Sequence, residues 1–252
     1  MNRQIRFLAA MLLLVSSQAT AAEYDARLEW ERRVELGTPV QGVVSEVKAQ
    51  AGQRIKAGAV LVQLDDRGFR ADVNKASTRV ASLKAVRAEA RREQERAEEL
   101  YDRTVLSDHE LQIALNEARQ AEADYAAARA ALVQARLNLE YSAVRSPFDA
   151  LVISVPAEQG QTVINDLQSV TLVTVADANS MIAQAELTEA QTRTLEVGQE
   201  ATVNVAGRTH TGRIKSIGLE PVEGTERYAV AVSFPLEGRR YRVGQTASIE
   251  LP

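Results

Sequence analysis

The chain contains no cysteine, only two histidines, and few aromatic residues, which make up 4% of it. Without cysteine there is no disulfide and no lipid-bearing N-terminal cysteine, so the fold must be held by packing. Large cores depend on aromatic side chains, so their scarcity favours thin β modules and long helices. His109 and His210 lie far apart in the sequence and are expected at the surface, which leaves no candidate catalytic group.

Methionine is also scarce, with three residues in the chain. Met1 and Met11 fall in a leader sequence, which leaves Met181 as the single thioether of the mature chain. Soft metal ions prefer clusters of thioether or thiolate ligands. We therefore expect no metal site, no cofactor and no enzymatic activity.

Charge of one sign does not dominate, since the formal net charge is −4. A mildly acidic protein lacks the excess positive charge that attracts nucleic acid. The densest charge run, residues 91–96, mixes Arg with Glu and is typical of a solvated helix face.

Residues 1–21 have the organisation of a secretion signal. Arg3 and Arg6 precede an apolar run over residues 7–15, and Ala19-Thr-Ala21 is an Ala-x-Ala cleavage site. The apolar run is shorter than the ~20 residues that a spanning helix needs. We expect cleavage and export; retention as a membrane anchor is the alternative.

An internal repeat flanks the middle of the chain. Residues 39–55 and 147–163 match at a constant offset of 108, with 6 identities in 17 positions. The identical pairs begin at Pro39 and Pro147 and end at Gln53 and Gln161. Two matching β half-motifs predict one small β domain assembled from both.

The insertion between the half-motifs, residues 67–142, is predicted to be a helical hairpin. No Gly or Pro interrupts residues 69–102, and Asp66 is a plausible N-cap. Ser107 and Glu110 form a capping box at the start of a second helix. The apolar seam of the first helix is broken at Arg87 and Gln94, and that of the second runs unbroken; its positions are Leu111, Ala114, Ala118, Ala121, Tyr125, Ala128, Leu132, Ala135 and Leu139. A 3.5-residue period in both helices predicts an antiparallel coiled coil.

Short strands follow the second half-motif. We expect six of them in a small antiparallel barrel over residues 167–252, with one short helix over residues 188–197. The expected strands are Val170–Val175, Met181–Leu187, Ala201–Val205, Gly212–Ile217, Tyr228–Phe234 and Thr246–Leu251. Alternation from Leu28 to Leu36 predicts a strand near the N-terminus, and residues 22–33 are expected to join the barrel.

The fold class is therefore mixed α and β: a lipoyl-like β domain, residues 34–66 and 143–166, split by a long antiparallel coiled-coil hairpin and followed by a small antiparallel β-barrel. The order of these parts behind a signal peptide resembles the periplasmic adaptor (membrane fusion protein, HlyD-type) family of bacterial tripartite efflux systems. The resemblance is carried by Gly52–Asp65 and by Ser146–Asp149 followed by Gly160–Val163, although the family usually has Gly where Ala150 stands.

Family members that dock on TolC-type outer-membrane channels have an R-x3-L-x6-S pattern at the hairpin tip. Arg96, Leu100 and Ser107 match it, and the resemblance implies that they contact the channel. Each residue also has an ordinary explanation: a solvated charge, a seam residue and an N-cap.

The resemblance further implies the partners and the location. It implies an inner-membrane transporter of the resistance-nodulation-division (RND) class, with an ABC exporter as the alternative. It also implies a homo-oligomer of three or six copies in the periplasm, peripheral to the inner membrane, without a lipid anchor. The chain reads as a short form with no evident membrane-proximal domain.

Two other functions stay open at this point. A periplasmic coiled-coil scaffold that binds no channel would share the hairpin. A carrier domain would need a modified lysine on the hairpin between its half-motifs, where this chain has the coiled coil; Lys48 lies within a half-motif instead.

Overall fold

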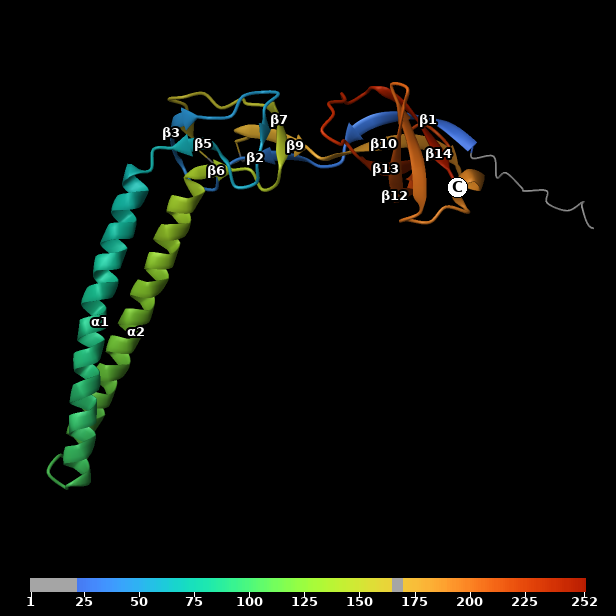
Figure 1. Cartoon of the computed structure of the whole chain (residues 1–252). Helices are drawn as coiled ribbons and strands as arrows, with labels where there is room; N and C mark the ends of the chain where they lie inside the picture. The colour runs from blue at the N-terminus through green and yellow to red at the C-terminus, as the bar shows by residue number, and fades with distance from the viewer. Residues whose placement is uncertain (1–21, 165–169) are drawn as a thin grey trace, which may run out of the picture. The chain divides into compact units, whose positions relative to one another are not determined.

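The computed structural model describes residues 22–164 and 170–252 (Figure 1). The predicted signal, residues 1–21, lies outside the described residues. The chain divides into two compact units, one of residues 33–178 and the other of the segments up to Arg32 and from Asn179 to Pro252. The predicted fold class is confirmed, since the chain contains a β domain split by a long helical hairpin and a closed six-stranded barrel.

The split β domain has two four-stranded sheets, with strand orders β2-β9-β7-β4 and β6-β5-β3-β8. Its strands are β2 Arg33–Leu36, β3 Gly42–Val47, β4 Arg54–Ile55, β5 Val60–Leu64, β6 Ala143–Arg145, β7 Ala150–Ser154, β8 Thr162–Val163 and β9 Val173–Asp177. Each sheet takes strands from both sides of the insertion, so neither half-motif completes a sheet alone. Val44, Leu64, Val152 and Val163 are among the buried residues of the shared core.

The two copies of the repeat exchange equivalent hydrogen bonds. The N–H of Gly52 donates to the carbonyl of Val152, and the N–H of Gly160 donates to the carbonyl of Val44, both at 2.8 Å. Gly160 is the repeat equivalent of Gly52, and Val44 is the repeat equivalent of Val152. The second bond is therefore the symmetry equivalent of the first. The pairings β3–β8 and β4–β7 have the same relation. The repeat in the sequence is thus an approximate two-fold symmetry in the fold.

Asp149 links the second half-motif to the first. Its Oδ1 accepts from the backbone N–H of Ala57 at 2.9 Å, and its Oδ2 accepts from Lys56 Nζ at 3.1 Å. The Ala57 N–H and the Lys56 ammonium hold the pKa of the Asp149 carboxyl below its usual value. The next residue, Ala150, is fully buried in β7 and pairs with Ile55, so alanine is accommodated where the family usually has glycine.

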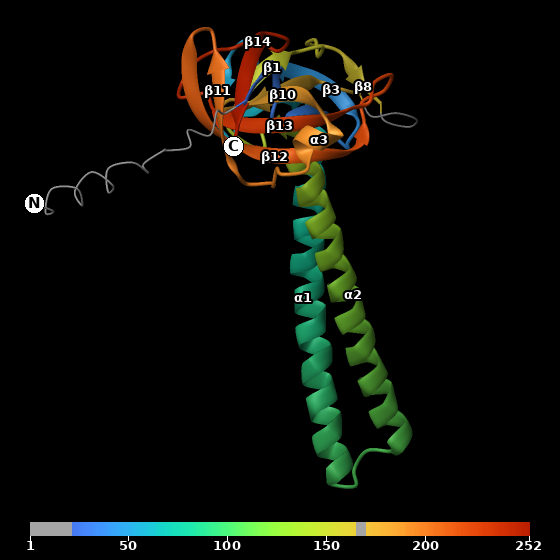
Figure 2. The same ribbon diagram turned by 90° about the vertical axis from the view of Figure 1, so that its right-hand side faces the viewer.

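The insertion is an antiparallel pair of helices, α1 Arg67–Asp102 and α2 Asp108–Tyr141 (Figures 1 and 2). All nine predicted seam positions of α2 are buried or half-buried. The most buried are Ala121 and Ala128, opposite a helix whose buried residues are Leu83 and Ala97. Small residues at these positions allow the two backbones to approach each other.

Arg87, a break in the predicted α1 seam, makes polar contacts with α2. Its Nε lies 3.4 Å from Glu122 Oε2, and its guanidinium carbon lies 4.5 Å from the centre of the Tyr125 ring. An ion pair and a cation–π contact therefore replace apolar packing at this level of the coiled coil.

The start of α1 differs from the predicted cap. Asp66 occupies the N-cap position, but its side chain makes no capping hydrogen bond and pairs with Arg70 instead, at 2.8 Å. The preceding residue, Asp65, accepts from the backbone N–H of Arg67 at 3.2 Å and from its guanidinium. These bonds, led by the side-chain bond to Arg67, lower the pKa of Asp65 to about 2.

The barrel closes in the order β1-β10-β13-β12-β11-β14. Its strands are β1 Ala22–Trp30, β10 Ser180–Thr188, β11 Glu200–Val205, β12 Arg208–Pro221, β13 Arg227–Pro235 and β14 Thr246–Leu251. Alternate side chains fill the interior, with Leu28, Met181, Val203, Phe234 and Ile249 fully or almost fully buried. The short helix, α3 Glu189–Thr192, is shorter than the predicted 188–197.

One assignment of a strand to the barrel was wrong, and one predicted strand was wrong in its extent. The segment predicted as the strand 170–175 forms β9, which pairs with β7 and β2 in the split domain. The strand predicted over residues 28–36 is two strands, since β1 joins the barrel and β2 pairs with β9. The barrel begins at residue 179 rather than 167. Alternation reveals a strand but carries no information about which sheet it joins.

His210 is a buried residue, contrary to the expectation for both histidines. It is 5% exposed, and its Nε2 lies 2.8 Å from the Tyr241 hydroxyl. Its ring lies 5.2 Å from that of Phe234. The imidazole therefore packs in the barrel and has a hydrogen-bond partner there.

Candidate docking site at the hairpin tip

The turn between the helices is a tight helix C-cap. The N–H of Val105 donates to the carbonyl of Leu100 at 3.0 Å, and the N–H of Thr104 donates to that of Tyr101 at 2.8 Å. This pair of bonds is the Schellman motif. Glycine usually occupies its left-handed position, but here Thr104 does, with φ 59°. A β-branched residue is strained in this conformation.

Ser107 fixes the start of α2 through the predicted capping box, which is confirmed. The N–H of Glu110 donates to Ser107 Oγ at 3.3 Å, and Glu110 Oε2 accepts from the N–H of Ser107 at 3.0 Å and from its hydroxyl at 2.6 Å. The Ser107 hydroxyl and N–H keep the pKa of Glu110 below its usual value. The Ser107 hydroxyl is thus already engaged within its own helix.

Arg96 and Leu100 lie one turn apart on α1, and residues at this spacing share a helix face. The Arg96 side chain is 62% exposed. Its Nη1 contacts both carboxylate oxygens of Glu93, at 2.7 and 2.9 Å. Leu100 is half-buried. No described contact joins Arg96, Leu100 and Ser107 to one another, so the three are separate points on one tip rather than one polar cluster.

The structure adds Val105 and Tyr101 to the tip surface. Val105 is 69% exposed and Tyr101 is 39% exposed. Neither residue belongs to the R-x3-L-x6-S pattern. The sequence does contain an indication that Val105 could be functional, because it is an apolar residue in a short turn between two polar helix ends. The tip therefore offers apolar side chains next to a fork of guanidinium donors.

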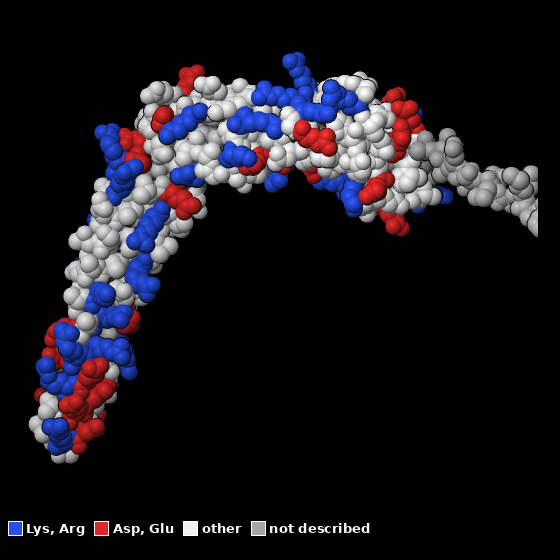
Figure 3. Space-filling model, in the orientation of Figure 1, with Lys and Arg blue, Asp and Glu red and all other residues white. Residues whose placement is uncertain are grey.

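Charged side chains of both signs crowd the tip half of the hairpin, whereas the visible face nearer the sheets has large uncharged areas (Figure 3). Several of these charges pair along the helix, as Arg96 does with Glu93 and Arg92 does with Glu89. Such exposed pairs contribute little to stability, and a partner can recruit them at little energetic cost.

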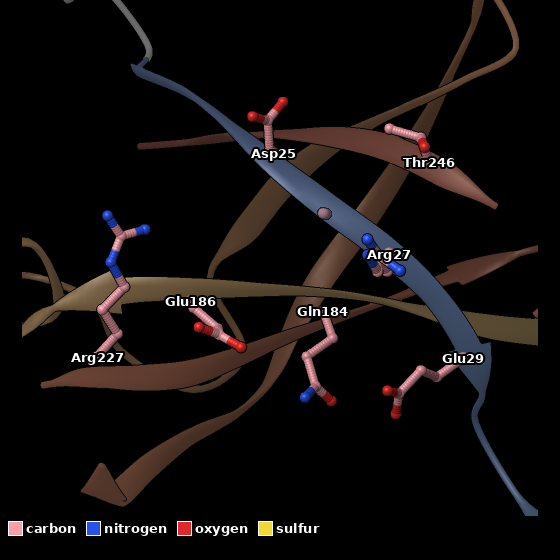
Figure 4. A pocket seen from close by; sticks show the side chains of 8 residues that line it. Asp25, Arg27, Glu29, Gln184, Glu186, Arg227 and Thr246 are labelled. Atoms are coloured by element: carbon pink, nitrogen blue, oxygen red, sulfur yellow. The ribbon is translucent and has the colours of Figure 1, made fainter. Parts of the chain in front are cut away.

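A concave feature lies on the outer wall of the barrel. A cleft of about 460 Å³ is lined by outward-facing residues of β1 and β10, including Asp25, Arg27, Glu29 and Glu186 (Figure 4). Acidic and basic side chains alternate along β1, which is typical of a solvated sheet face.

Within residues 22–164 and 170–252, none of the helices combines the length and the apolar character of a membrane span. The same residues contain no group of three or more His, Asp or Glu side chains arranged to hold a metal ion.

Comparison with known proteins matches the family profile of the CzcB-like, barrel-sandwich hybrid domain to residues 32–177. The chain is 26% identical over 244 residues to the macrolide export protein MacA of Yersinia pestis, covering 89% of this chain and 66% of that protein. It is 27% identical over 212 residues to the multidrug efflux pump subunit AcrA of Escherichia coli, covering 82% and 53%. It thus spans less than two thirds of either relative.

Among solved structures, the chain resembles a chimeric MacA-MexA protein that contains the MexA α-hairpin domain of Pseudomonas aeruginosa. The TM-score is 0.68 at 25% identity, over 90% of this chain and 79% of the chimera. The similarity includes the split β domain, the hairpin and the barrel, so it extends well beyond the segment that the family profile matches.

Proposed function

Because the chain belongs to the periplasmic adaptor, or membrane fusion protein, family, we propose that it links an inner-membrane transporter to a TolC-type outer-membrane channel in a tripartite efflux pump. The observation that carries this is the hairpin, which the split β domain holds at both ends and which exposes an apolar, arginine-bearing tip. Export of small molecules is inferred from the macrolide export and multidrug efflux named for the relatives.

In this proposal the tip docks on the channel. Arg96 offers forked donors to carbonyls or carboxylates at a helix end of the channel, after exchanging its bond to Glu93. Leu100 and Val105 supply apolar contact. Ser107 holds the first turn of α2 in place and presents its backbone near the partner.

The action of the protein is structural. Several copies, three or six, surround an export path in the periplasm, and the transporter supplies the energy. An RND transporter is the preferred inner-membrane partner, and an ABC-type exporter is the alternative. Export behind a cleaved signal, without a lipid anchor, places the chain at the periplasmic side of the inner membrane.

The test is in-cell photo-crosslinking from a probe at Val105, with mass spectrometry of the product. Val105 is preferable to Thr104 because a bulky residue at the left-handed Thr104 position would strain the turn. A crosslink to an outer-membrane channel protein supports the adaptor function. A folded, exported protein that yields no such crosslink would favour the scaffold that binds no channel.

Arg96→Glu tests the tip assignment, and the chain offers a matched control in Arg92→Glu. Arg92 and Arg96 have side chains of similar exposure, and each pairs with a glutamate three residues earlier. We expect Arg96→Glu to abolish drug export and the Val105 crosslink, with thermal stability nearly unchanged, because exposed ion pairs contribute little to folding. Arg92→Glu should preserve export. Equal effects of the two variants would count against a specific role for Arg96.

A further inference from the structure

One end of the barrel gathers α3 and the loop between β12 and β13. β10 ends at Thr188, opposite Arg227 at the start of β13, and β12 ends at Pro221, opposite Tyr228. α3 follows β10 directly, and Figure 2 shows it beside β12 and β13. This is termed the α3 end. The other end, termed the linker end, holds the β13–β14 loop and the connections to residues 33–178.

The α3 end exposes large apolar side chains. Leu219 is 94% exposed and Val197 is 65% exposed, so neither is covered by the described chain. Between α3 and the β12–β13 loop lies a cleft of about 830 Å³, whose lining includes Ala190, Pro221 and Tyr228. A protruding apolar residue next to a partly apolar cleft has the relief of a protein–protein contact, in which anchors fill pockets.

The same end is acidic. Glu220, Glu223 and Glu226 fall within seven residues, and their side chains make no hydrogen bond or ion pair with the described residues. Residues 219–227 contain one basic residue, Arg227. Unpaired carboxylates around an apolar centre form a rim that complements lysine and arginine.

The linker end has the opposite charge. The β13–β14 loop, residues 236–245, contains three arginines and one glutamate. The barrel is therefore polarised along its strands, with the negative pole at the α3 end. An anionic lipid surface would repel that pole, whereas a basic protein surface would attract it.

We propose that the α3 end docks on a basic, partly apolar protein surface, the periplasmic face of the inner-membrane transporter, and not on membrane lipid. This inference rests on the proposed adaptor function and specifies the surface that serves it. Leu219 is the central apolar anchor, and the three glutamates orient the contact by pairing with basic side chains of the transporter.

A photo-crosslinking probe at Leu219 in the full chain, in cells, tests the surface. The expected product joins Leu219 to a lysine- or arginine-rich periplasmic segment of an integral inner-membrane transporter. A probe at Val243, an exposed apolar residue of the linker end, should not give this product.

Three results with the Leu219 probe would overturn the proposal: a lipid adduct, a second copy of this chain, or no adduct. If the Val105 probe still captures the channel in that experiment, the adaptor function stands and this surface alone is wrong. If neither probe captures its partner, the adaptor function fails as well.

Charge reversal tests the acidic rim. Glu220→Lys, Glu223→Lys and Glu226→Lys together should lower the Leu219 crosslink by at least about tenfold, because like charges would then face each other. The control reverses Asp25, Glu29 and Glu186 to lysine; these exposed acids line the barrel-wall cleft of Figure 4 and give the same change in net charge. An equal loss in both variants would show a general charge effect and overturn the proposed contact.

Vesicles of phosphatidylethanolamine and phosphatidylglycerol test the lipid alternative directly. The α3 end of the unchanged mature chain should not bind these vesicles, so the chain should not sediment with them. The triple reversal variant should bind and sediment. Sedimentation of the unchanged chain that Leu219→Asp weakens would identify lipid as the occupant and overturn the proposal.

Discussion

Thr104 is the strained residue of the hairpin tip, since it holds a left-handed backbone conformation with φ 59°. Such conformations store strain most often at functional sites. Thr104 lies between Leu100 and Ser107, the residues proposed to meet the channel. A glycine here would remove the backbone strain of the turn, and it would also increase the conformational freedom of the unfolded chain.

We predict that Thr104→Gly raises the free energy of unfolding of the hairpin by about 0.5–1 kcal/mol, because the αL penalty for a residue with a Cβ disappears. Guanidinium unfolding followed by far-ultraviolet circular dichroism measures the change. Thr104→Ala keeps the Cβ and removes the branching together with the hydroxyl, which donates to the Arg103 carbonyl at 2.7 Å, so this variant should gain less stability than the glycine variant. A loss of stability in the glycine variant would contradict the strain.

Asp149 connects the two half-motifs through its ionised carboxylate. Its pKa lies below the ordinary value of 3.8 because the Ala57 N–H and Lys56 stabilise the anion. A lowered pKa in the folded state contributes stability above the unfolded value and loses it as the pH falls through the folded value. Urea unfolding should therefore show Asp149→Asn less stable than the unchanged chain near neutral pH. The difference should shrink as the pH falls below 3.8 and through the folded-state pKa of Asp149, and a constant gap at all pH values would exclude the ionic contribution.

At the scale of the element, the coiled coil follows from its sequence almost position by position. The α2 seam was predictable because the 3.5-residue period decides which side chains face the partner helix. Arg87 was not, because a charged residue in a seam is accommodated only by contacts with a specific neighbour. Tyr125 and Glu122 supply those contacts, and the sequence gives no pairing between the two helices.

We predict that Ala121→Asp destabilises the hairpin by roughly 2–4 kcal/mol, because it buries an uncompensated carboxylate in the seam. Ala121 is 5% exposed. Ala123→Asp, at an exposed position two residues along α2, should change the melting temperature little. Circular dichroism melting measures both, and similar shifts in the two variants would contradict the assigned seam.

The contact between Arg87 and Tyr125 should be worth about 0.5–1 kcal/mol. A double-mutant cycle with Arg87→Gln and Tyr125→Leu isolates the coupling free energy from the general effect of each substitution. Glu122 stays in place throughout, so its ion pair with Arg87 is removed equally in both arms that carry Arg87→Gln. A coupling indistinguishable from zero would mean that the ring only fills space.

At the scale of the whole molecule, the repeat predicted the split β domain because the two copies share their pattern of turns and buried positions. The boundary of the barrel was not predictable, since the apolar pattern that identifies β9 as a strand does not say which sheet it joins. Sheet membership is decided by partners that are distant in the sequence, such as β2 and β7 for β9. For the same reason the contact of Asp149 with Ala57 and Lys56, 92 and 93 residues earlier, emerged only from the fold.

The exchange of hydrogen bonds between the half-motifs has a consequence for how the chain folds. Gly52 and Gly160 must find Val152 and Val44 across an insertion that would be a very long loop if it were disordered. Closing such a loop costs on the order of 4 kcal/mol in chain entropy. Helices α1 and α2 pack against each other and form from contacts that are local in the sequence. We predict that the hairpin forms first and brings residues 66 and 143 together before the sheets assemble. The hairpin thus acts as a folding clamp, and substitutions in its seam should slow assembly of the β domain from which it projects.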